Sequence, residues 1–229
     1  MNQNVWNDFI ALFYPNICLI CDKPIVQTEK FICVNCFLSM AKVQRETCCE
    51  NDLLSKFAAY PQVTLARSFL EFNRNGPTQQ LVHAFKYGGQ KMLAFFLGKL
   101  MASDCKAFFG ENQWDFIVPV PLHSSRQKSR GYNQAEMLAL GFGEELEIPV
   151  LNDQVSRVKQ TKTQTGKNRI ARWQSTKNMY GVTEKFMLQS KKVVLIDDVV
   201  TTGATISGLV ELLAESGVAE IGVVSLASE

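Results

Sequence analysis

The feature that most constrains the fold is an apolar run that ends in two acids and leads at once into a glycine-containing turn. Residues 193–196 are continuously apolar, as expected of a strand buried on both faces of a parallel sheet. Asp197 and Asp198 follow, then two valines and Thr-Thr-Gly-Ala-Thr (201–205), which leads into a helical pattern at 204–216 that Gly217 ends. A strand, a loop and a helix in this order predict a parallel α/β crossover.

The same alternation of strand and helix patterns runs through the chain after about residue 50. Strands are expected at 63–72, 114–122 and 221–227, with a further short candidate at 147–151. Helices are expected at 78–102, with a break near Gly88-Gly89, and at 132–146. Residues 154–183 have weak periodicity and predict a mobile loop. We therefore expect a three-layer α/β domain over residues 51–229.

The two acids fall at the carboxyl edge of the predicted sheet, where open α/β sheets bind ligands. Carboxylates accept hydrogen bonds from vicinal hydroxyls, and a loop that opens a helix offers N–H groups to a phosphate. Asp197 and Asp198 are therefore expected to hold a polyol, and the phosphate is expected at Thr201, Thr202, Gly203, Ala204 and Thr205.

This stretch has two other interpretations. A nucleoside triphosphatase would need a G-x-x-x-x-G-K-[ST] loop, but the Gly-Lys pairs at 98–99 and 166–167 are followed by Leu100 and Asn168. Alternatively, the acids only end a strand and the threonines only begin a helix. The fixed order of apolar run, acid pair and hydroxyl loop favours the sugar-phosphate site.

The segment VVLIDDVVTTGAT resembles the phosphoribosyl pyrophosphate (PRPP) motif of type I phosphoribosyltransferases at all thirteen positions. The segments PVPLHSSRQKSRGYNQAEMLA (119–139), KYGGQ (86–90) and Q-T-G-x-x-R-x-x-R (164–172) are similar to the ComF/GntX family of competence-associated proteins. The resemblance implies a Rossmann-like sheet of type I phosphoribosyltransferase type with an N-terminal zinc module. It also implies that Asp197 and Asp198 bind the ribose hydroxyls and that the threonine loop binds the 5′-phosphate.

Basic side chains are concentrated in two acid-free stretches, although the net charge is only +2. Arg126, Lys128 and Arg130 follow the strand expected to end at Pro121, so they are candidates for stabilising a pyrophosphate leaving group. Magnesium is expected with PRPP, because it binds phosphate oxygens.

The second basic stretch, 154–183, holds seven Lys and Arg residues. It could close as a lid over the site, with Arg169 or Arg172 above the ligand. It could instead be a solvated surface loop, or bind single-stranded DNA through its cations together with Trp173 and Tyr180. The family resemblance to competence proteins implies single-stranded DNA and a competence helicase as possible partners.

Two C-x₂-C pairs, Cys18/Cys21 and Cys33/Cys36, stand eleven residues apart and predict a closed four-thiolate zinc site with a structural role. Residues 1–50 are therefore expected to form a zinc module preceded by a short amphipathic helix. The adjacent Cys48 and Cys49 form no second such pair, which favours a single zinc. Cys105, in a helical apolar pattern, is expected to be buried.

The sequence shows no secretion signal and no run of about 20 apolar residues, so we expect a cytoplasmic protein without a membrane span. The sequence leaves three hypotheses for the function. The protein transfers phosphoribosyl to a nucleobase-like acceptor with pyrophosphate release, senses PRPP or a nucleotide without catalysis, or acts in DNA uptake by binding single-stranded DNA. The sequence does not identify an acceptor base.

Overall fold

The computed structural model describes residues 16–26, 29–43, 52–109, 114–152, 154–157, 180–183 and 185–229. The expected N-terminal helix, Cys48, Cys49 and most of the basic stretch, including Arg169, Arg172 and Trp173, lie outside these residues.

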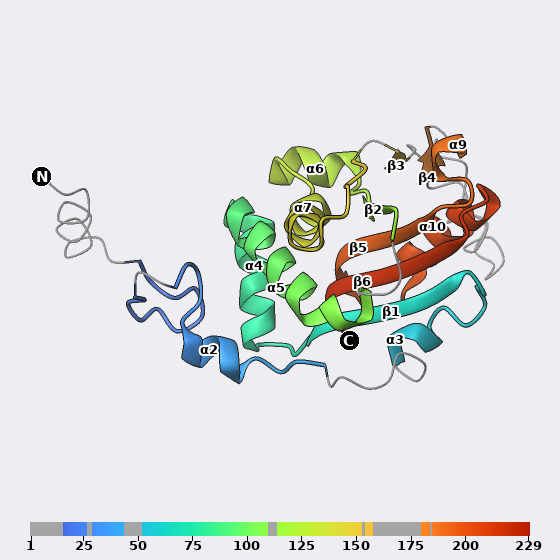
Figure 1. Ribbon diagram of the computed structural model, residues 1–229. Coiled ribbons are helices and arrows are strands. Elements are labelled where there is room, and N and C mark those ends of the chain that lie inside the picture. The colour runs from blue at the N-terminus through green and yellow to red at the C-terminus, as the bar shows by residue number, and fades with distance from the viewer. Residues whose placement is uncertain are drawn as a thin grey trace, which may run out of the picture.

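The centre of the molecule is a parallel four-stranded sheet, as the sequence predicts (Figure 1). Its strands are β1 (Val63–Glu71), β6 (Glu220–Ser228), β5 (Lys192–Val200) and β2 (Phe116–Pro119), in that spatial order. The strand with the acid pair, β5, is central, between β6 and β2.

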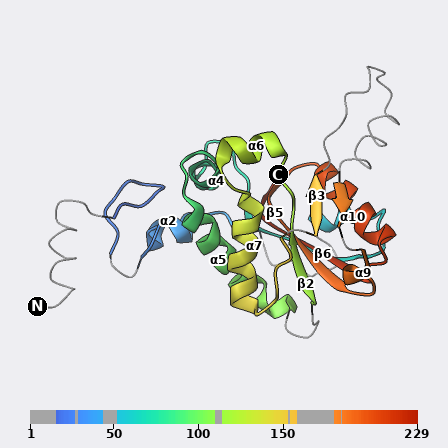
Figure 2. The ribbon, with the colours of Figure 1, turned by 90° about the horizontal axis from the view of Figure 1, so that it is seen from above.

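Helices cover both faces of the sheet (Figure 2). On one face, α4 (Pro77–Tyr87), α5 (Lys91–Phe109) and α7 (Gln134–Leu146) form a core with Val194 and Ile196 of β5. On the other face, α10 (Ala204–Glu215) packs on Val193 and Leu195, with the short helices α3 (Asp52–Ser55) and α9 (Lys185–Leu188) nearby. The alternation of side chains along β5 thus serves two cores, which explains its continuously apolar sequence.

Helices α5 and α7 approach each other closely at two glycines. A Cβ atom on Gly98 would lie 2.2 Å from the carbonyl oxygen of Leu138, and one on Gly141 would lie 2.0 Å from that of Phe95. Only glycine permits this backbone approach, which holds the amino end of α7 near the carboxyl edge of the sheet.

The structure differs from the expected pattern at three places. Residues 147–151 form no strand; Val150 makes only a single bridge to Ile117. The described ends of the expected 154–183 loop pair as two short antiparallel strands, β3 (Val155–Arg157) and β4 (Tyr180–Val182). The basic segment after β2 forms a helix, α6 (Ser124–Arg130). The strand predicted at 147–151 was wrong, and so was the loop predicted for the described ends of 154–183; no element had been predicted for 124–130. Short elements rest on pairing and capping rather than on apolar periodicity.

The cysteine-containing segment lies beside α4 and α5 and ends in α2 (Val34–Ser39), drawn in blue in Figure 1. Cys18, Ile32 and Met40 are buried in the core that α4 and α5 share. Residues 41–43 then run antiparallel to β1, where the Glu71 N–H donates to the Ala41 carbonyl oxygen at 2.9 Å. The module is therefore tied to the sheet by both packing and backbone hydrogen bonds.

Among the residues described, none of the helices is both long enough and apolar enough to cross a membrane.

Candidate functional site

The acid pair lies where β5 extends beyond its neighbour β2. The last paired residue of β2, Pro119, is opposite Ile196, so Asp197 and Asp198 follow the end of that pairing. The strand itself continues through the acid pair to Val200. The Asp198 N–H donates to Asp197 Oδ1 at 2.8 Å, which fixes the first carboxylate against the backbone of the second acid.

Lys86 is the counter-ion of the second acid. Its Nζ lies 2.9 Å from Asp198 Oδ2, and the two side chains are only 18% and 15% exposed. Lys86 belongs to the last turn of α4, directly before the break at Gly88-Gly89. The K-Y-G-G segment contributes to the family resemblance, but no role for this lysine was predicted from it; its place at a helix end before a glycine pair was the available signal.

Asp197 has the most perturbed carboxyl group at this edge. Burial, and then the neighbouring charge of Asp198, raise its pKa to about 8, and Lys86 only partly opposes them. Burial likewise raises the pKa of the nearby Tyr180 to about 12. The pair therefore holds an acid that is easily protonated near neutral pH, which is typical of functional sites.

The phosphate-loop candidate follows β5 and opens α10. Gly203 is the residue before the helix and has a φ of 74°, in the left-handed region that favours glycine. It has no side chain to cap the helix, and the Ala204 N–H meets Thr202 Oγ1 only at 3.5 Å, so the first turn of α10 can offer N–H groups to an anion. On the outer side of the loop, Lys56 Nζ donates to the backbone oxygens of Thr201 and Glu229. The loop is thus supported by a lysine that comes from far earlier in the chain.

Helix α6 carries the arginines of the first basic stretch. His123 caps its start, because its ring Nδ1 accepts from the Ser125 N–H at 3.3 Å, and Gly131, with a φ of 78°, ends it. Arg130 donates to Gln134 Oε1 at 2.9 Å and to the Tyr87 hydroxyl at 3.3 Å. The helix therefore presents its last turn toward α4 and α7.

These elements enclose a cavity of about 320 Å³. The predicted residues Arg126, Arg130, Asp197, Asp198, Thr201 and Thr205 line it, whereas Lys128, Thr202, Gly203 and Ala204 do not. The lining also contains Phe72, Val82, Lys86, Val120, Pro121, Leu122, Asn133, Gln134, Ala135, Arg157 and Val199, none of which was predicted as a site residue. Lys128 lies on α6 with its side chain exposed.

The charges and open hydrogen bonds of this cavity suit an anion that carries hydroxyl groups. Four cations, Lys86, Arg126, Arg130 and Arg157, line it with two acids. The Gln134 side chain is 1% exposed, and its Nε2 finds no hydrogen-bond partner among the described residues. A buried donor without an acceptor is unfavourable, so this amide fits a site that a ligand oxygen completes.

The four predicted metal ligands come together in the N-terminal module. The sulfur atoms of Cys18, Cys21, Cys33 and Cys36 all lie within 4.8 Å of one another. The first knuckle turns at Asp22, whose φ is 56° and whose N–H donates to the Cys18 carbonyl oxygen at 3.0 Å. Cys105 is buried far along the chain in α5, as expected.

The sulfur environment fits a tetrahedral thiolate metal such as zinc. The Cys33 N–H donates to Cys18 Sγ, and the Cys36 N–H donates to Cys33 Sγ, each at 3.4 Å. Burial alone would raise the pKa of Cys18, but hydrogen bonds from backbone N–H groups lower it to about 6. The backbone therefore favours the thiolate form of Cys18, whereas burial and the neighbouring thiols raise the pKa of Cys36, so a cation among the four sulfur atoms would be needed to hold all of them as thiolates.

Comparison with known proteins assigns the chain to a family. Residues 106–229 match the model of the phosphoribosyl transferase domain, a range that contains the acid pair, the phosphate loop and α6. Competence protein F of Haemophilus influenzae is 38% identical over 155 residues, which cover 66% of this chain and 68% of that protein. The chain belongs to the ComF family.

Two more distant relatives extend the ComF-family match over almost the whole chain. The DNA utilization protein YhgH of Salmonella typhimurium is 28% identical over 93% of this chain and 96% of its own length. Competence protein ComFC of Streptococcus pneumoniae is 26% identical over 92% of this chain and 86% of its own. The family match therefore takes in the four-cysteine segment as well as the phosphoribosyltransferase-like sheet.

Proposed function

We propose that this ComF-family protein binds PRPP in the 320 Å³ cavity and transfers its phosphoribosyl group to a nitrogen nucleophile. The observation that carries the proposal is one cavity lined by the acid pair, two residues of the phosphate loop and three arginines. In this arrangement Asp197 and Asp198 accept from the ribose hydroxyls, and the amino end of α10 receives the 5′-phosphate. Arg126 and Arg130 lie at the pyrophosphate end, where negative charge grows as the bond to the sugar breaks.

Magnesium fits the donors that the site offers. The described lining contains two carboxylates, and a bound pyrophosphate would add further oxygens, the ligand type that this ion prefers. When bound, magnesium would neutralise part of the charge on the leaving group. Lys86 would hold the Asp198 carboxyl group in place through their 2.9 Å contact.

The first test removes both charges that are proposed to hold the ribose. The double variant Asp197→Asn/Asp198→Asn keeps the side-chain shapes but removes both groups that can carry a negative charge to the ribose, and binding is compared above pH 8, where Asp197 is ionised. We expect PRPP affinity with magnesium, measured by calorimetry, to fall at least roughly 100-fold, since charge-assisted hydrogen bonds are the strong ones. Asp115→Asn, at the opposite end of the sheet, is the matched control and should bind PRPP like the wild type.

Unchanged binding by the double variant would refute the proposed site. If PRPP binds, incubation with labelled PRPP, magnesium and a panel of bases decides between transfer and sensing. Pyrophosphate release that depends on one base establishes transfer. Binding without base-dependent release favours a non-catalytic PRPP sensor.

A second candidate function is binding of single-stranded DNA. Its support is the relatives' names, which refer to competence and DNA utilization, and the surface beside the cavity. Tyr87 is 66% exposed, Arg130 lies 5.2 Å from its ring centroid, and Lys128 is exposed on the adjoining helix. An exposed ring beside cations is the combination that stacks bases and neutralises phosphates. A competence helicase stays a predicted partner.

A variant of Lys128 can distinguish DNA binding from PRPP binding, because this residue lies outside the cavity lining. Lys128→Glu should weaken binding of a single-stranded oligonucleotide and reduce its salt slope by about 1 or more, while PRPP affinity stays within about twofold. Oligonucleotide binding that this charge reversal leaves unchanged would count against a nucleic-acid surface on α6.

A further inference from the structure

One face of the sheet carries a row of polar side chains at the level of Asp197. Ser225 of β6 pairs in register with Asp197 of β5 and, on its other side, with Ser68 of β1. Neighbouring strands lie about 4.8 Å apart, and residues in register on parallel strands point to the same face. Leu195 and Val223, two positions before Asp197 and Ser225 on the same strands, belong to the core under α10. The polar row therefore faces α10.

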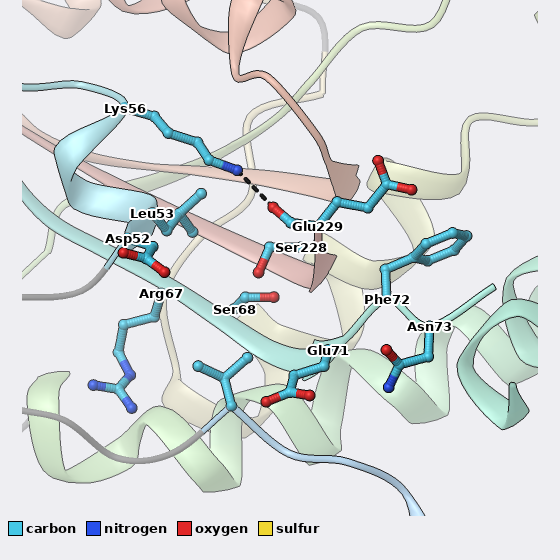
Figure 3. A pocket seen from close by; sticks show the side chains of 11 residues that line it. Asp52, Leu53, Lys56, Arg67, Ser68, Glu71, Phe72, Asn73, Ser228 and Glu229 are labelled. Carbon is cyan, nitrogen blue, oxygen red and sulfur yellow. Dashed lines mark hydrogen bonds between the residues drawn. The ribbon is translucent and has the colours of Figure 1, made fainter.

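Ser68 ends this row at a second cavity, of about 530 Å³, at the carboxyl ends of β1 and β6 (Figure 3). Its hydroxyl donates to the Leu70 carbonyl oxygen at 3.1 Å and is therefore satisfied. Ser225, by contrast, lines neither this cavity nor the proposed PRPP site, and it is 0% exposed. Its hydroxyl is shut off from the solvent in both cavities, so its hydrogen-bond partner must come from the interior of the protein.

Tyr180 of β4 brings a second buried hydroxyl toward Asp197. Its side chain is 5% exposed and packs in the same core under α10. Burial raises the pKa of Tyr180 to about 12; Arg157 opposes this change, and the charge of Asp197 adds to it. The phenol therefore lies within electrostatic reach of the Asp197 carboxylate. Because the ring is buried, it is not available to stack on a base, the role considered for Tyr180 from the sequence.

Both hydroxyls lack a hydrogen-bond partner among the described residues. The oxygen atoms of Tyr180 and Ser225 are buried and unpaired, which is unfavourable for groups that can donate. Asp197 offers an acceptor beside them. Its Oδ1 accepts from the Asp198 N–H, and Lys86 is held by Asp198, so Oδ2 of Asp197 is left for other donors. Two buried donors thus accompany one carboxylate of the proposed PRPP site.

We infer that Tyr180 and Ser225 are positioning residues, whose hydroxyls donate to Asp197 and aim its carboxylate at the ribose hydroxyls of PRPP. Their role rests on the proposed function, because it is exerted only if Asp197 holds the ribose. Rotation about the side-chain bonds brings the donors into range, since serine has three staggered rotamers and a hydroxyl hydrogen turns to suit its acceptor. Neither residue lines the PRPP cavity, so each acts through Asp197.

The test deletes one hydroxyl at a time. Tyr180→Phe keeps the buried ring and removes its oxygen, and Ser225→Ala removes the other hydroxyl. Tyr60→Phe, at a partly buried tyrosine packed against the same core, is the matched control. The Kd of PRPP with magnesium is measured by calorimetry above pH 8, where Asp197 is ionised, for each variant alone and combined with Asp197→Asn.

We expect Tyr180→Phe and Ser225→Ala each to weaken PRPP binding roughly tenfold, since hydrogen bonds to charged groups are the stronger kind. Tyr60→Phe should stay within about twofold of the wild type. In the Asp197→Asn protein the same two substitutions should change the affinity less than about twofold, because the charge through which they act is gone. A loss of equal size in both backgrounds overturns the assigned role, and a substitution without effect on the wild type removes its residue from it.

Pyrophosphate with magnesium provides a second measurement, because this ligand has no ribose hydroxyls. Both hydroxyl variants should bind it like the wild type, whereas a parallel loss of pyrophosphate binding would indicate general damage to the site and overturn the positioning role. If PRPP fails to bind the wild type, the proposed function fails and this role with it. If PRPP binds, and Asp197→Asn/Asp198→Asn weakens it while the hydroxyl variants do not, the proposed function stands and only the positioning role fails.

Discussion

The four-cysteine cluster and the acid pair both bring chemically like groups close together, but different interactions stabilise them. In the cluster, four sulfur atoms lie within 4.8 Å of one another on a segment with few buried residues of its own. In the acid pair, two carboxylates lie on a central strand with a complete core on both faces. A bound metal would stabilise the cysteine cluster, whereas the packing of the sheet and its helices must offset the repulsion between the two carboxylates.

The two sites differ in whether they stabilise or destabilise the folded protein. A structural metal site contributes its binding energy to folding, about 10–16 kcal/mol in isolated peptides, so loss of the metal is loss of structure. The acid pair works against the fold, since a partly buried carboxylate beside another is unfavourable when ionised. We therefore expect removal of a metal-binding cysteine to lower the stability of the folded protein and removal of an acid charge to raise it.

Removal of one metal ligand should produce the largest effect. Cys36→Ser, at a half-buried cysteine, is expected to abolish stoichiometric zinc and to lower the melting temperature of the zinc-loaded protein. Even a loss of about 3 kcal/mol of metal binding corresponds to roughly 6–12 °C for a chain of this size. Metal content by mass spectrometry and thermal unfolding with and without a chelator measure both quantities.

The matched control for this prediction is Cys105→Ala, which alters a buried thiol outside the cluster. It should keep one zinc per chain and should still lose stability when a chelator is added. Zinc content that Cys36→Ser leaves unchanged, or a chelator without effect on the wild type, would contradict the proposed structural zinc.

The sequence predicted those parts of the site that are continuous along the chain. The strand with Asp197 and Asp198 and the helix after Gly203 were readable because an apolar run, an acid pair and a turn stand in one order. The break between α4 and α5 was equally readable from Gly88-Gly89. Local patterns of this kind determine local structure.

The parts that were missed depend on residues brought together from distant segments. Lys86 meets Asp198 from a helix far earlier in the chain, and Lys56 meets Thr201 across 145 positions. Helix α6 has no apolar stripe, so only its caps, His123 and Gly131, could have revealed it. Contacts between distant segments are set by the packing of the whole sheet, which no local pattern encodes.

The smaller effect concerns pH and has the opposite sign to the zinc prediction. The pKa of Asp197 is raised from an ordinary 3.8 to about 8, so its contribution to stability is fully present below pH 3.8 and is lost as pH rises through 8. Asp197→Asn should therefore match the wild type near pH 4 and become more stable with rising pH. The gain should be largest at pH 8.5, above the raised pKa, and should appear as a melting temperature several degrees higher than that of the wild type.

Asp115 supplies a control of opposite sign within the same sheet. Its pKa is lowered, first by the hydrogen bond from the Lys192 N–H and then by Lys191, so its contribution is present above pH 3.8 and is lost only as pH falls through the lower value. Asp115→Asn should thus lower stability by the same amount at pH 6 and pH 8.5, while the effect of Asp197→Asn grows between them. In the Asp197→Asn variant the new amide oxygen can still accept the Asp198 N–H, so the comparison isolates the charge. If the stability difference between Asp197→Asn and the wild type is the same at pH 6 and pH 8.5, as it should be for Asp115→Asn, then the charge of Asp197 does not destabilise the fold.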